Sequence, residues 1–421
     1  MSYTQTISSL LENLFEKSIK APTKLLFKKK SKDGVYQVLE KLLNTKSNTS
    51  RVKYAKEFFA IVDLLDDREF KDLMLHLRDE RDIDANLLKL CSENYINENS
   101  EINYIKLQEA LSTERKDLFR RLNCFDESTI HLVNLRKRIL SHSSANQNFQ
   151  KVEHDLKTLF IDWFNRGFLI LKPIDWNTPA SILEKIIKYE SVHQINTWRE
   201  LRDRIDSHDR RCFAFFHPAM ATEPLIFVEI AFLNEVPSKI DIILDTQRNT
   251  LSEAEANTAV FYSISNCQRG LDGISFGNFL LKEVVTFIEK EIPNIKNFIT
   301  LSPVPKFMAW LKTHDNDLHT EITASPEIEN INKYEEQLNS RIRDYLLISN
   351  REDKKPNDPV SRFHLGNGAS IYRINFMADT SKSSLQKGAS FMINYKYDTK
   401  YIEKNHEQYT KHNQIIVKKN I

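Results

Sequence analysis

Cysteine, glycine and proline are scarce in this chain, and long hydrophobic runs are missing. Only four of the 421 residues are cysteines, and Cys91, Cys124, Cys212 and Cys267 lie far apart without a CxxC pair. Neither a disulfide framework nor a structural zinc site is therefore expected. No apolar segment approaches the roughly 20 residues that cross a bilayer, and the acidic-containing start does not resemble a secretory signal. A reducing cytoplasm is the expected compartment.

The chain also lacks an excess of charge of either sign. Lysine and arginine number 60, against 58 aspartates and glutamates. The composition therefore gives no reason to expect a nucleic-acid or membrane-surface partner. Hydrophobic residues make up 41% and charged residues 28%, which is a balance typical of globular domains. The length predicts two or three domains of about 150 residues each.

The distribution of the helix breakers predicts a domain boundary. Proline is absent between Pro22 and Pro173, and most of the eight glycines come later. A stretch without these residues favours helices, and apolar residues recur there at helical spacing, as in residues 55–65. We expect a helical bundle over residues 1–166 and a second domain over residues 167–421.

Short segments rich in β-branched and aromatic residues mark the second domain as strand-containing. They are CFAFF near residue 212, LIFVEIAF from 225, IDIIL from 240, TAVFYSIS from 258, NFITLS from 297, SIYRINFM from 370 and SFMINYKY from 390. Between two of them, Phe276, Leu280, Val284 and Ile288 recur at i, i+4 and Pro293 follows, which predicts a helix. A strand, a helix and a strand form a βαβ unit, so we expect an α/β or α+β domain with a mixed sheet.

A glycine-containing stretch, SISNCQRGLDGISFGNFLLKEVV, connects one predicted strand to this helix. Gly270, Gly273 and Gly277 would let the backbone approach a ligand closely, and the helix N-terminus that follows favours a phosphate. The spacing fits neither a Walker loop nor a Rossmann fingerprint. The residues alone therefore leave two interpretations open: a phosphate site, or a tight connection without a ligand.

Two further residues are candidates for chemistry. Ser302 ends a predicted strand in TLSPVPKF, and ligands of open α/β sheets bind beyond the carboxyl ends of strands. His364 precedes a Gly-Asn-Gly turn in DPVSRFHLGNGA. A serine before proline commonly starts a turn, and a histidine before a tight turn is commonly a structural donor. Neither residue identifies a reaction by itself.

Together these segments resemble those of malonyl-CoA decarboxylases. The similarity extends from about Trp163 to Asp398 and rests on WFNRGFLILKPIDW, HPAMATEPLIFVEIAF, AVFYSISNCQRGLDGISFGNFLLKEV, TLSPVPKF, DPVSRFHLGNGA, RINFMADTS and MINYKYD. The resemblance implies an N-terminal helical domain that serves oligomerisation and a catalytic domain similar to GNAT acyltransferases. The expected fold is therefore an all-α helical bundle followed by an α/β, GNAT-like acyl-CoA-binding domain with a mixed sheet.

The resemblance also implies a set of site residues. The positions that match the family's malonyl-CoA loop are Asp272, Gly273, Ile274, Ser275, Phe276, Gly277 and Asn278. Ser302 matches the catalytic serine, a proton acceptor, and His364 matches the catalytic histidine, a proton donor. Both would also contact the substrate.

The implied reaction converts malonyl-CoA to acetyl-CoA and CO2 through an enolate. Hydrogen-bond donors at the thioester oxygen would stabilise the enolate, and an imidazole with a pKa near neutrality would protonate it. The reaction needs no metal and no biotin. The expected partners are malonyl-CoA and further copies of the chain, with no nucleic acid and no membrane.

Two positions depart from the family, because Lys306 and Ser390 stand where members usually have glycine. Two alternative functions remain. A GNAT-like acyltransferase would move an acyl group from CoA to an amine, which would not explain why Ser302 and His364 occur together. A non-catalytic CoA-binding scaffold would keep only the fold.

Overall fold

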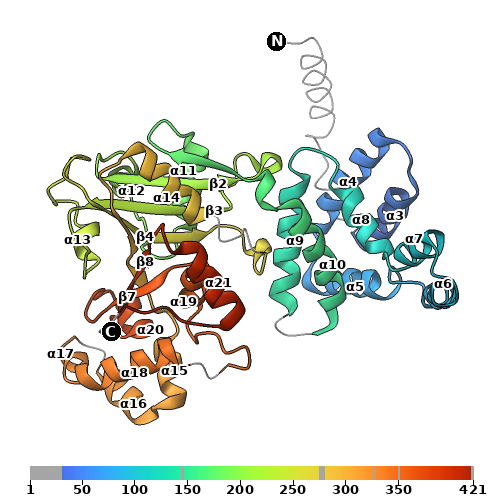
Figure 1. The fold of residues 1–421 in the computed structure, drawn as a ribbon. Helices are drawn as coiled ribbons and strands as arrows, with labels where there is room; N and C mark the ends of the chain where they lie inside the picture. The colour runs from blue at the N-terminus through green and yellow to red at the C-terminus, as the bar shows by residue number, and fades with distance from the viewer. Residues whose placement is uncertain (1–30, 144–146, 275–279, 326–327, 349–350, 419–421) are drawn as a thin grey trace. The chain divides into compact units, whose positions relative to one another are not determined.

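The computed structural model describes residues 31–143, 147–274, 280–325, 328–348 and 351–418. The chain divides into two compact units, which are coloured along the sequence in Figure 1. The first unit comprises Met1–Trp163 together with Arg269–Ile274, and the second comprises Phe164–Gln268 and Ser275–Ile421. We refer to them as the helical unit and the α/β unit.

The helical unit contains no strand among its described residues. Its helices are α3 (Ser31–Asn44), α4 (Asn48–Val62), α5 (Asp67–Asp79), α6 (Ala85–Asn97), α7 (Glu101–Ala110), α8 (Glu114–Leu122), α9 (Ser128–Ser143) and α10 (Gln150–Trp163), with 3-10 turns η1 (Gln147–Phe149) and η4 (Arg269–Leu271). The sequence marks the helix starts: Asp66 and Glu69 form a capping box at α5. Phe58, Phe70 and Phe160 are fully buried in this unit. The predicted N-terminal helical region is confirmed.

The α/β unit is built on one sheet of eight strands. They are β1 (Ile170–Ile174), β2 (Arg210–Phe216), β3 (Ile226–Leu233), β4 (Thr258–Asn266), β5 (Asn297–Thr300), β6 (Ser302–Pro303), β7 (Ser370–Asn375) and β8 (Met392–Tyr397). The order is β1-β2-β3-β4-β5-β8-β6, and β7 also pairs with β8. Among the strands of the described residues, β4 and β5 are the one parallel pair, because the connection through α14 (Leu280–Glu291) returns the chain in the same direction. An isolated bridge between Ile371 of β7 and Val417 is also parallel. The predicted mixed sheet and its βαβ unit are confirmed.

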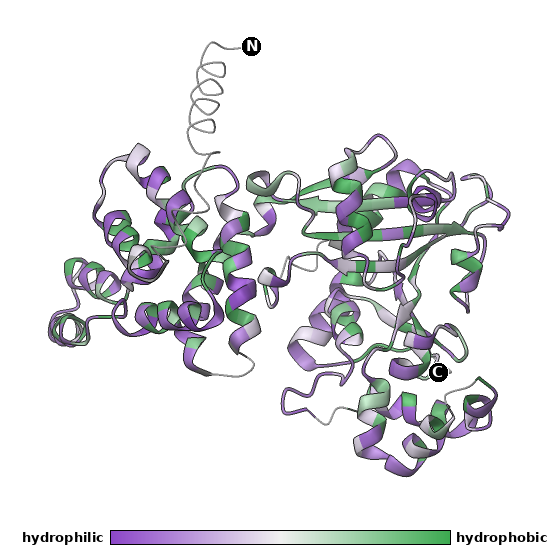
Figure 2. Cartoon of the chain, turned by 180° about the vertical axis from the view of Figure 1, so that it is seen from behind, coloured by the Kyte–Doolittle hydropathy of each residue, from purple (hydrophilic) through white to green (hydrophobic). Residues whose placement is uncertain are grey.

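Helices surround this sheet. They are α11 (Ala180–Tyr189), α12 (Trp198–Ile205), α13 (Asp241–Leu244), α14, α15 (Phe307–His314), α16 (Asn316–Ala324), α17 (Ile328–Asn332), α18 (Glu335–Leu347), α19 (Pro359–Gly366), α20 (Lys382–Gly388) and α21 (Ile402–His412), with turns η2 (Arg166–Phe168) and η3 (Pro218–Met220). Figure 2 shows that the inner strands are largely hydrophobic, whereas the helices carry both hydrophobic and hydrophilic residues.

The alternation of side chains along the strands gives each sheet face its own core. Phe213 of β2 and Phe261 of β4 belong to the same cluster as Val284 of α14. The neighbouring Ala214 belongs to a second cluster with Ile186 of α11. Both faces of the sheet are therefore covered by helices, and the inner strands are hydrophobic throughout.

Two predictions of local structure differ from the structure. IDIIL, expected as a strand, forms the short helix α13 preceded by its N-cap Ile240. Ile240 and Ile243 are buried, whereas Ile242 is 44% exposed. A run of five apolar residues is too short for its periodicity to distinguish a helix from a strand. The edge strand β1 was not among the expected strands, because Lys172 and Pro173 interrupt its apolar pattern.

Candidate active site

Ser302 and His364 lie in hydrogen-bond contact, although 62 positions separate them in sequence. Ser302 opens β6, where it pairs with Ile393 of β8. His364 lies in the last turn of α19. The Oγ of Ser302 is 2.9 Å from Nε2 of His364, and the two side chains are only 5% and 2% exposed.

The hydrogen bonds around this pair assign a tautomer to the imidazole. Ser302 donates its hydroxyl proton to Oγ1 of Thr300 at 2.9 Å, so Nε2 of His364 must donate to Ser302. Nδ1 of His364 then accepts from the hydroxyl of Tyr397, which is 2.8 Å away. The network therefore places the imidazole proton on Nε2, the nitrogen that faces the serine.

Burial controls the charge of these groups. Burial lowers the pKa of His364 to about 3, so the free imidazole is neutral at physiological pH. The expectation of a pKa near neutrality is wrong for the unliganded protein, because no charged partner offsets the loss of solvent. Burial also raises the pKa of the Tyr397 phenol, which remains a neutral donor.

A set of buried polar contacts holds the helix that carries His364. Asp358 caps α19 by accepting a hydrogen bond from the Ser361 amide at 2.7 Å and another from the Tyr345 hydroxyl at 3.2 Å. Burial raises the pKa of Asp358 to about 6. The ring of Tyr395 stacks on His364 at 4.5 Å, and its hydroxyl contacts Oγ of Ser361 at 2.5 Å. These contacts fix both the position and the tilt of the imidazole.

Sequence reasoning missed several members of this network, although three of them carry a signal. Asp358 precedes Pro359, and an N-cap residue followed by proline at the first helical position is a recognised helix start. Tyr395 and Tyr397 are two residues apart on a strand, which places both on one face. Thr300 carried no such signal.

The glycine-containing stretch is described only in part. Asp272, Gly273 and Ile274 lie in the structure, with Gly273 in the left-handed region at φ +73°, which favours glycine. The predicted loop residues Ser275, Phe276, Gly277 and Asn278 lie outside the described residues. Gly270 has a structural role: a Cβ there would lie 2.0 Å from the carbonyl oxygen of Val133 in α9.

The two departures from the family pattern have different consequences. Lys306 has φ −120° and ψ 8°, a conformation open to any residue. Ser390 has φ +66°, which favours glycine. Its hydroxyl donates to the Asp379 carbonyl at 2.5 Å, and this bond offsets part of the backbone strain. Neither residue contacts Ser302 or His364 among the described interactions.

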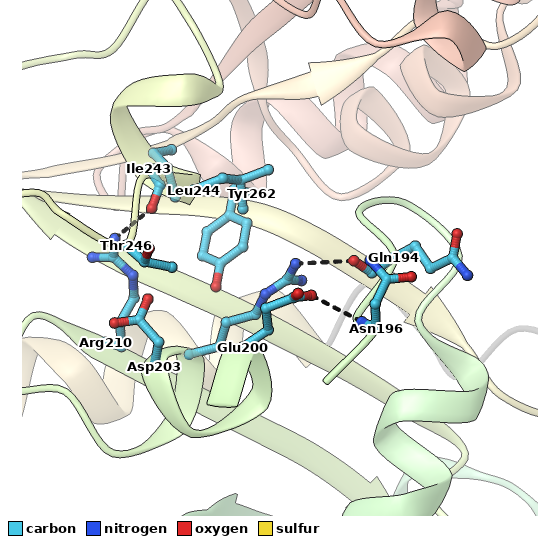
Figure 3. Close-up of a pocket in the computed structure, with 10 residues that line it drawn as sticks. Gln194, Asn196, Glu200, Asp203, Arg210, Ile243, Leu244, Thr246 and Tyr262 are labelled. Atoms are coloured by element: carbon cyan, nitrogen blue, oxygen red, sulfur yellow. Dashed lines mark hydrogen bonds between the residues drawn. The ribbon is translucent and has the colours of Figure 1, made fainter. Parts of the chain in front are cut away.

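A separate cavity of about 240 Å³ lies elsewhere in the α/β unit. It is lined by Gln194, Asn196, Glu200, Asp203, Arg204, Arg210, Ile243, Leu244, Thr246 and Tyr262. Figure 3 shows the Tyr262 ring between Arg210 and Asn196. Ion pairs surround the cavity, with Arg204 bonded to the buried Glu229 and Arg210 to Asp209. Neither Ser302 nor His364 lines it.

The described residues contain neither a candidate metal site nor a candidate membrane span. No group of three or more histidine, cysteine, aspartate or glutamate side chains there could hold a metal ion. None of the helices in the described part of the chain is both long and apolar enough to span a membrane.

The fold and the buried pair define a class of protein in which a helical region precedes a mixed-sheet α/β domain that contains a buried Ser–His contact. Residues 167–421 match the model of the malonyl-CoA decarboxylase C-terminal domain. Residues 82–164 match the model of the malonyl-CoA decarboxylase N-terminal domain. The chain belongs to the malonyl-CoA decarboxylase family.

Individual relatives support this membership. The crystal structure of malonyl-CoA decarboxylase from Rhodopseudomonas palustris has a TM-score of 0.88 and 38% identity, covering 92% of this chain and 98% of that one. That from Agrobacterium vitis has a TM-score of 0.86 and 38% identity, covering 91% and 97%. The goose (Anser anser anser) protein "Malonyl-CoA decarboxylase, mitochondrial" is 32% identical over 325 residues, which span 68% of this chain but only 64% of the goose protein.

Proposed function

We propose that this protein is a malonyl-CoA decarboxylase that converts malonyl-CoA to acetyl-CoA and CO2 with Ser302 and His364. The observation that carries the proposal is the 2.9 Å contact between Ser302 Oγ and His364 Nε2 in a member of this family. The family motifs alone matched these two residues separately, and their contact supports a joint role.

In the proposed reaction, the bond between the carboxylate carbon and the α-carbon of the malonyl group breaks. CO2 leaves, and the electron pair of that bond forms an enolate whose negative charge lies largely on the thioester oxygen. The Ser302 hydroxyl turns from Thr300 and donates a hydrogen bond to this oxygen, which lowers the barrier. Substrate binding brings His364 to the imidazolium form, so the α-carbon takes a proton from Nε2 of the imidazolium, and a neutral imidazole and acetyl-CoA result.

The proton donated by His364 must be replaced after each turnover. Nδ1 accepts a hydrogen bond from Tyr397 in the resting site, so Tyr397 holds the tautomer in which Nε2 carries the proton. The bound malonyl carboxylate would raise the pKa of the imidazole, because a nearby negative charge favours the charged form. Solvent protons can then restore the donor when CO2 and acetyl-CoA leave.

We further propose that Asp272–Asn278 form the loop that binds the CoA part of the substrate. The left-handed backbone of Gly273 supports this role, since a turn of this kind directs amide groups toward an anion. We assign the C-terminal region from residue 167 as the catalytic domain, the region 1–166 as the domain for self-association, and the cytoplasm as the compartment.

The experiment is incubation of the purified chain with malonyl-CoA and no acyl acceptor. The proposal predicts stoichiometric CO2 and acetyl-CoA. An acyltransferase would leave malonyl-CoA intact until an amine is added. A binding scaffold would retain malonyl-CoA without turnover, and this result would contradict the proposal.

A further inference from the structure

The segment Arg269–Ile274 connects β4 to α14 in sequence but belongs in space to the helical unit. Leu271 and Ile274 are 2% and 7% exposed. Gly270 lies so close to the carbonyl of Val133 that no side chain would fit. The first residues of the proposed CoA loop are therefore held by helices of the N-terminal region.

Arg136 of α9 makes the main polar contacts with this segment. Its guanidinium donates to the carbonyl oxygens of Gly270 at 2.7 Å and Asp272 at 2.9 Å. It also bonds the Glu153 carboxylate of α10 at 2.6 Å, and its own side chain is 1% exposed. A rigid, fully buried fork of this kind fixes the backbone on both sides of Leu271.

A second cation from the helical unit lies beside the glycine turn. Nζ of Lys157, on α10, is 3.4 Å from the point that a Cβ on Gly273 would occupy. Lys157 is half-buried, and it makes no hydrogen bond or ion pair with any residue that the structure describes. Arg136 bonds Oε1 of the neighbouring Glu153 carboxylate, and no carboxylate of the described residues forms an ion pair with Lys157.

Asp272 is the acidic residue of the segment, and its charge interacts with Arg136 and Arg269. The ammonium of Lys157 thus remains available to an anion that approaches Gly273. Coenzyme A brings such anions, because its nucleotide end carries phosphates. A lysine held next to a left-handed glycine turn suits a phosphate, which it contacts as a point charge.

We infer that the helical unit takes part in binding the CoA thioester: Lys157 pairs with a phosphate of the substrate at Gly273, and Arg136 positions Asp272–Ile274 for it. The inference rests on the proposed function for the identity of the thioester. Under this inference the N-terminal region binds the substrate in addition to serving self-association. Lys157 is a binding residue in this account, and Arg136 is a positioning residue.

The test compares two substrates with the wild type and Lys157→Gln. Malonyl-CoA carries the phosphates, whereas malonyl-pantetheine keeps the thioester without any phosphate. We expect Lys157→Gln to raise KM for malonyl-CoA by about 10-fold, the size of one charge-assisted contact that solvent partly screens. Its kcat should stay within about twofold of the wild type, and KM for malonyl-pantetheine should not change.

Matched controls come from the same helices. Lys151→Gln removes a lysine from α10 that pairs with Asp82 instead, and it should leave KM for malonyl-CoA unchanged. Arg115, like Arg136, is a buried arginine that bonds a carboxylate on α10, that of Asp155, and two backbone carbonyls, and it also pairs with Asp82. Arg136→Met and Arg115→Met should both lower the melting temperature, but only Arg136→Met should raise KM.

An unchanged KM for malonyl-CoA in Lys157→Gln would overturn the inference, and so would an equal rise with malonyl-pantetheine. If Arg136→Met does not fold, the comparison of wild type and Lys157→Gln with the two substrates decides the inference by itself. If the wild type shows no decarboxylation, the proposed function fails but the inference is still decided by calorimetry with CoA. About 10-fold weaker CoA binding by Lys157→Gln would support the inference, and equal binding would overturn it.

Discussion

His364 occupies a site that strongly disfavours its charged form. The imidazole has a pKa of about 3 because it is buried, whereas the unfolded chain would protonate it near 6.5. Between these values the unfolded state binds a proton that the folded state does not. The free energy of unfolding must therefore fall as the pH drops from about 6.5 toward 3.

This linkage gives a prediction for His364→Asn. The variant lacks the titrating ring, so its stability should fall less steeply with acid than that of the wild type. The difference should grow by up to ~1.4 kcal/mol per pH unit below about pH 6.5. Urea unfolding of both proteins at pH 7, 5.5 and 4 measures it. Parallel stability curves would mean that the imidazole titrates normally in the folded protein.

Tyr397 determines which imidazole nitrogen carries the proton, and its removal should affect the chemical step. We expect Tyr397→Phe to lower kcat by roughly 10- to 100-fold, less than loss of the imidazole itself, with little change in KM. Tyr395→Phe makes the same chemical change on the same strand, where the lost hydroxyl contacts Ser361 instead of His364. Steady-state kinetics should separate the two, and equal losses of kcat would contradict the assignment of the tautomer to Tyr397.

At the scale of elements, α19 depends on its N-terminal cap. The Asp358 carboxylate accepts from the Ser361 amide and the Tyr345 hydroxyl, and it is fully buried. Asp358→Ala should lower the free energy of unfolding by about 1–3 kcal/mol, because the cap and a buried partner are lost together. Chemical denaturation measures this loss. Ser381→Ala, at the exposed N-cap of α20, is the control and should cost less than Asp358→Ala.

The sequence predicted those elements whose pattern is long or strictly periodic. The βαβ unit follows from the apolar β4 and the i, i+4 pattern of α14, and both are present. The strand prediction for IDIIL was wrong because the run is too short to show a helical or strand periodicity, so its tertiary packing determines that it forms a helical turn. The contact between Ser302 and His364 could be expected only from the resemblance, because it depends on how β6 and α19 meet through β8. The pKa of His364 depends on burial by residues distant in sequence, which no local pattern shows.

At the scale of the whole molecule, α6 and α7 stand out for the apolar side chains that they leave uncovered. Leu90, Ile96, Ile102 and Ile105 are 55%, 79%, 65% and 53% exposed. Cys91 is the buried residue of α6, and Ala110 is that of α7. Such a surface on the unit that we assign to self-association suits a contact with a second copy of the chain.

We therefore expect Ile96→Glu together with Ile102→Glu to shift the protein to a smaller species in light scattering after size exclusion. The thermal stability of the subunit itself should change little, because both side chains are exposed. Ile242→Glu, which alters an equally apolar exposed residue of the α/β unit, is the control. A wild-type chain that is already monomeric would contradict this assignment of the surface.

The most direct test of the whole account is the turnover of malonyl-CoA by Ser302→Ala, His364→Asn and the double variant, followed as release of CO2 beside thermal melts and CoA-binding calorimetry. We predict that each single variant loses at least ~100-fold in kcat while it still folds and binds CoA. The double variant should be little worse than the poorer single one, because the two side chains act as a unit. Near-normal turnover by a well-folded Ser302→Ala variant would contradict the account.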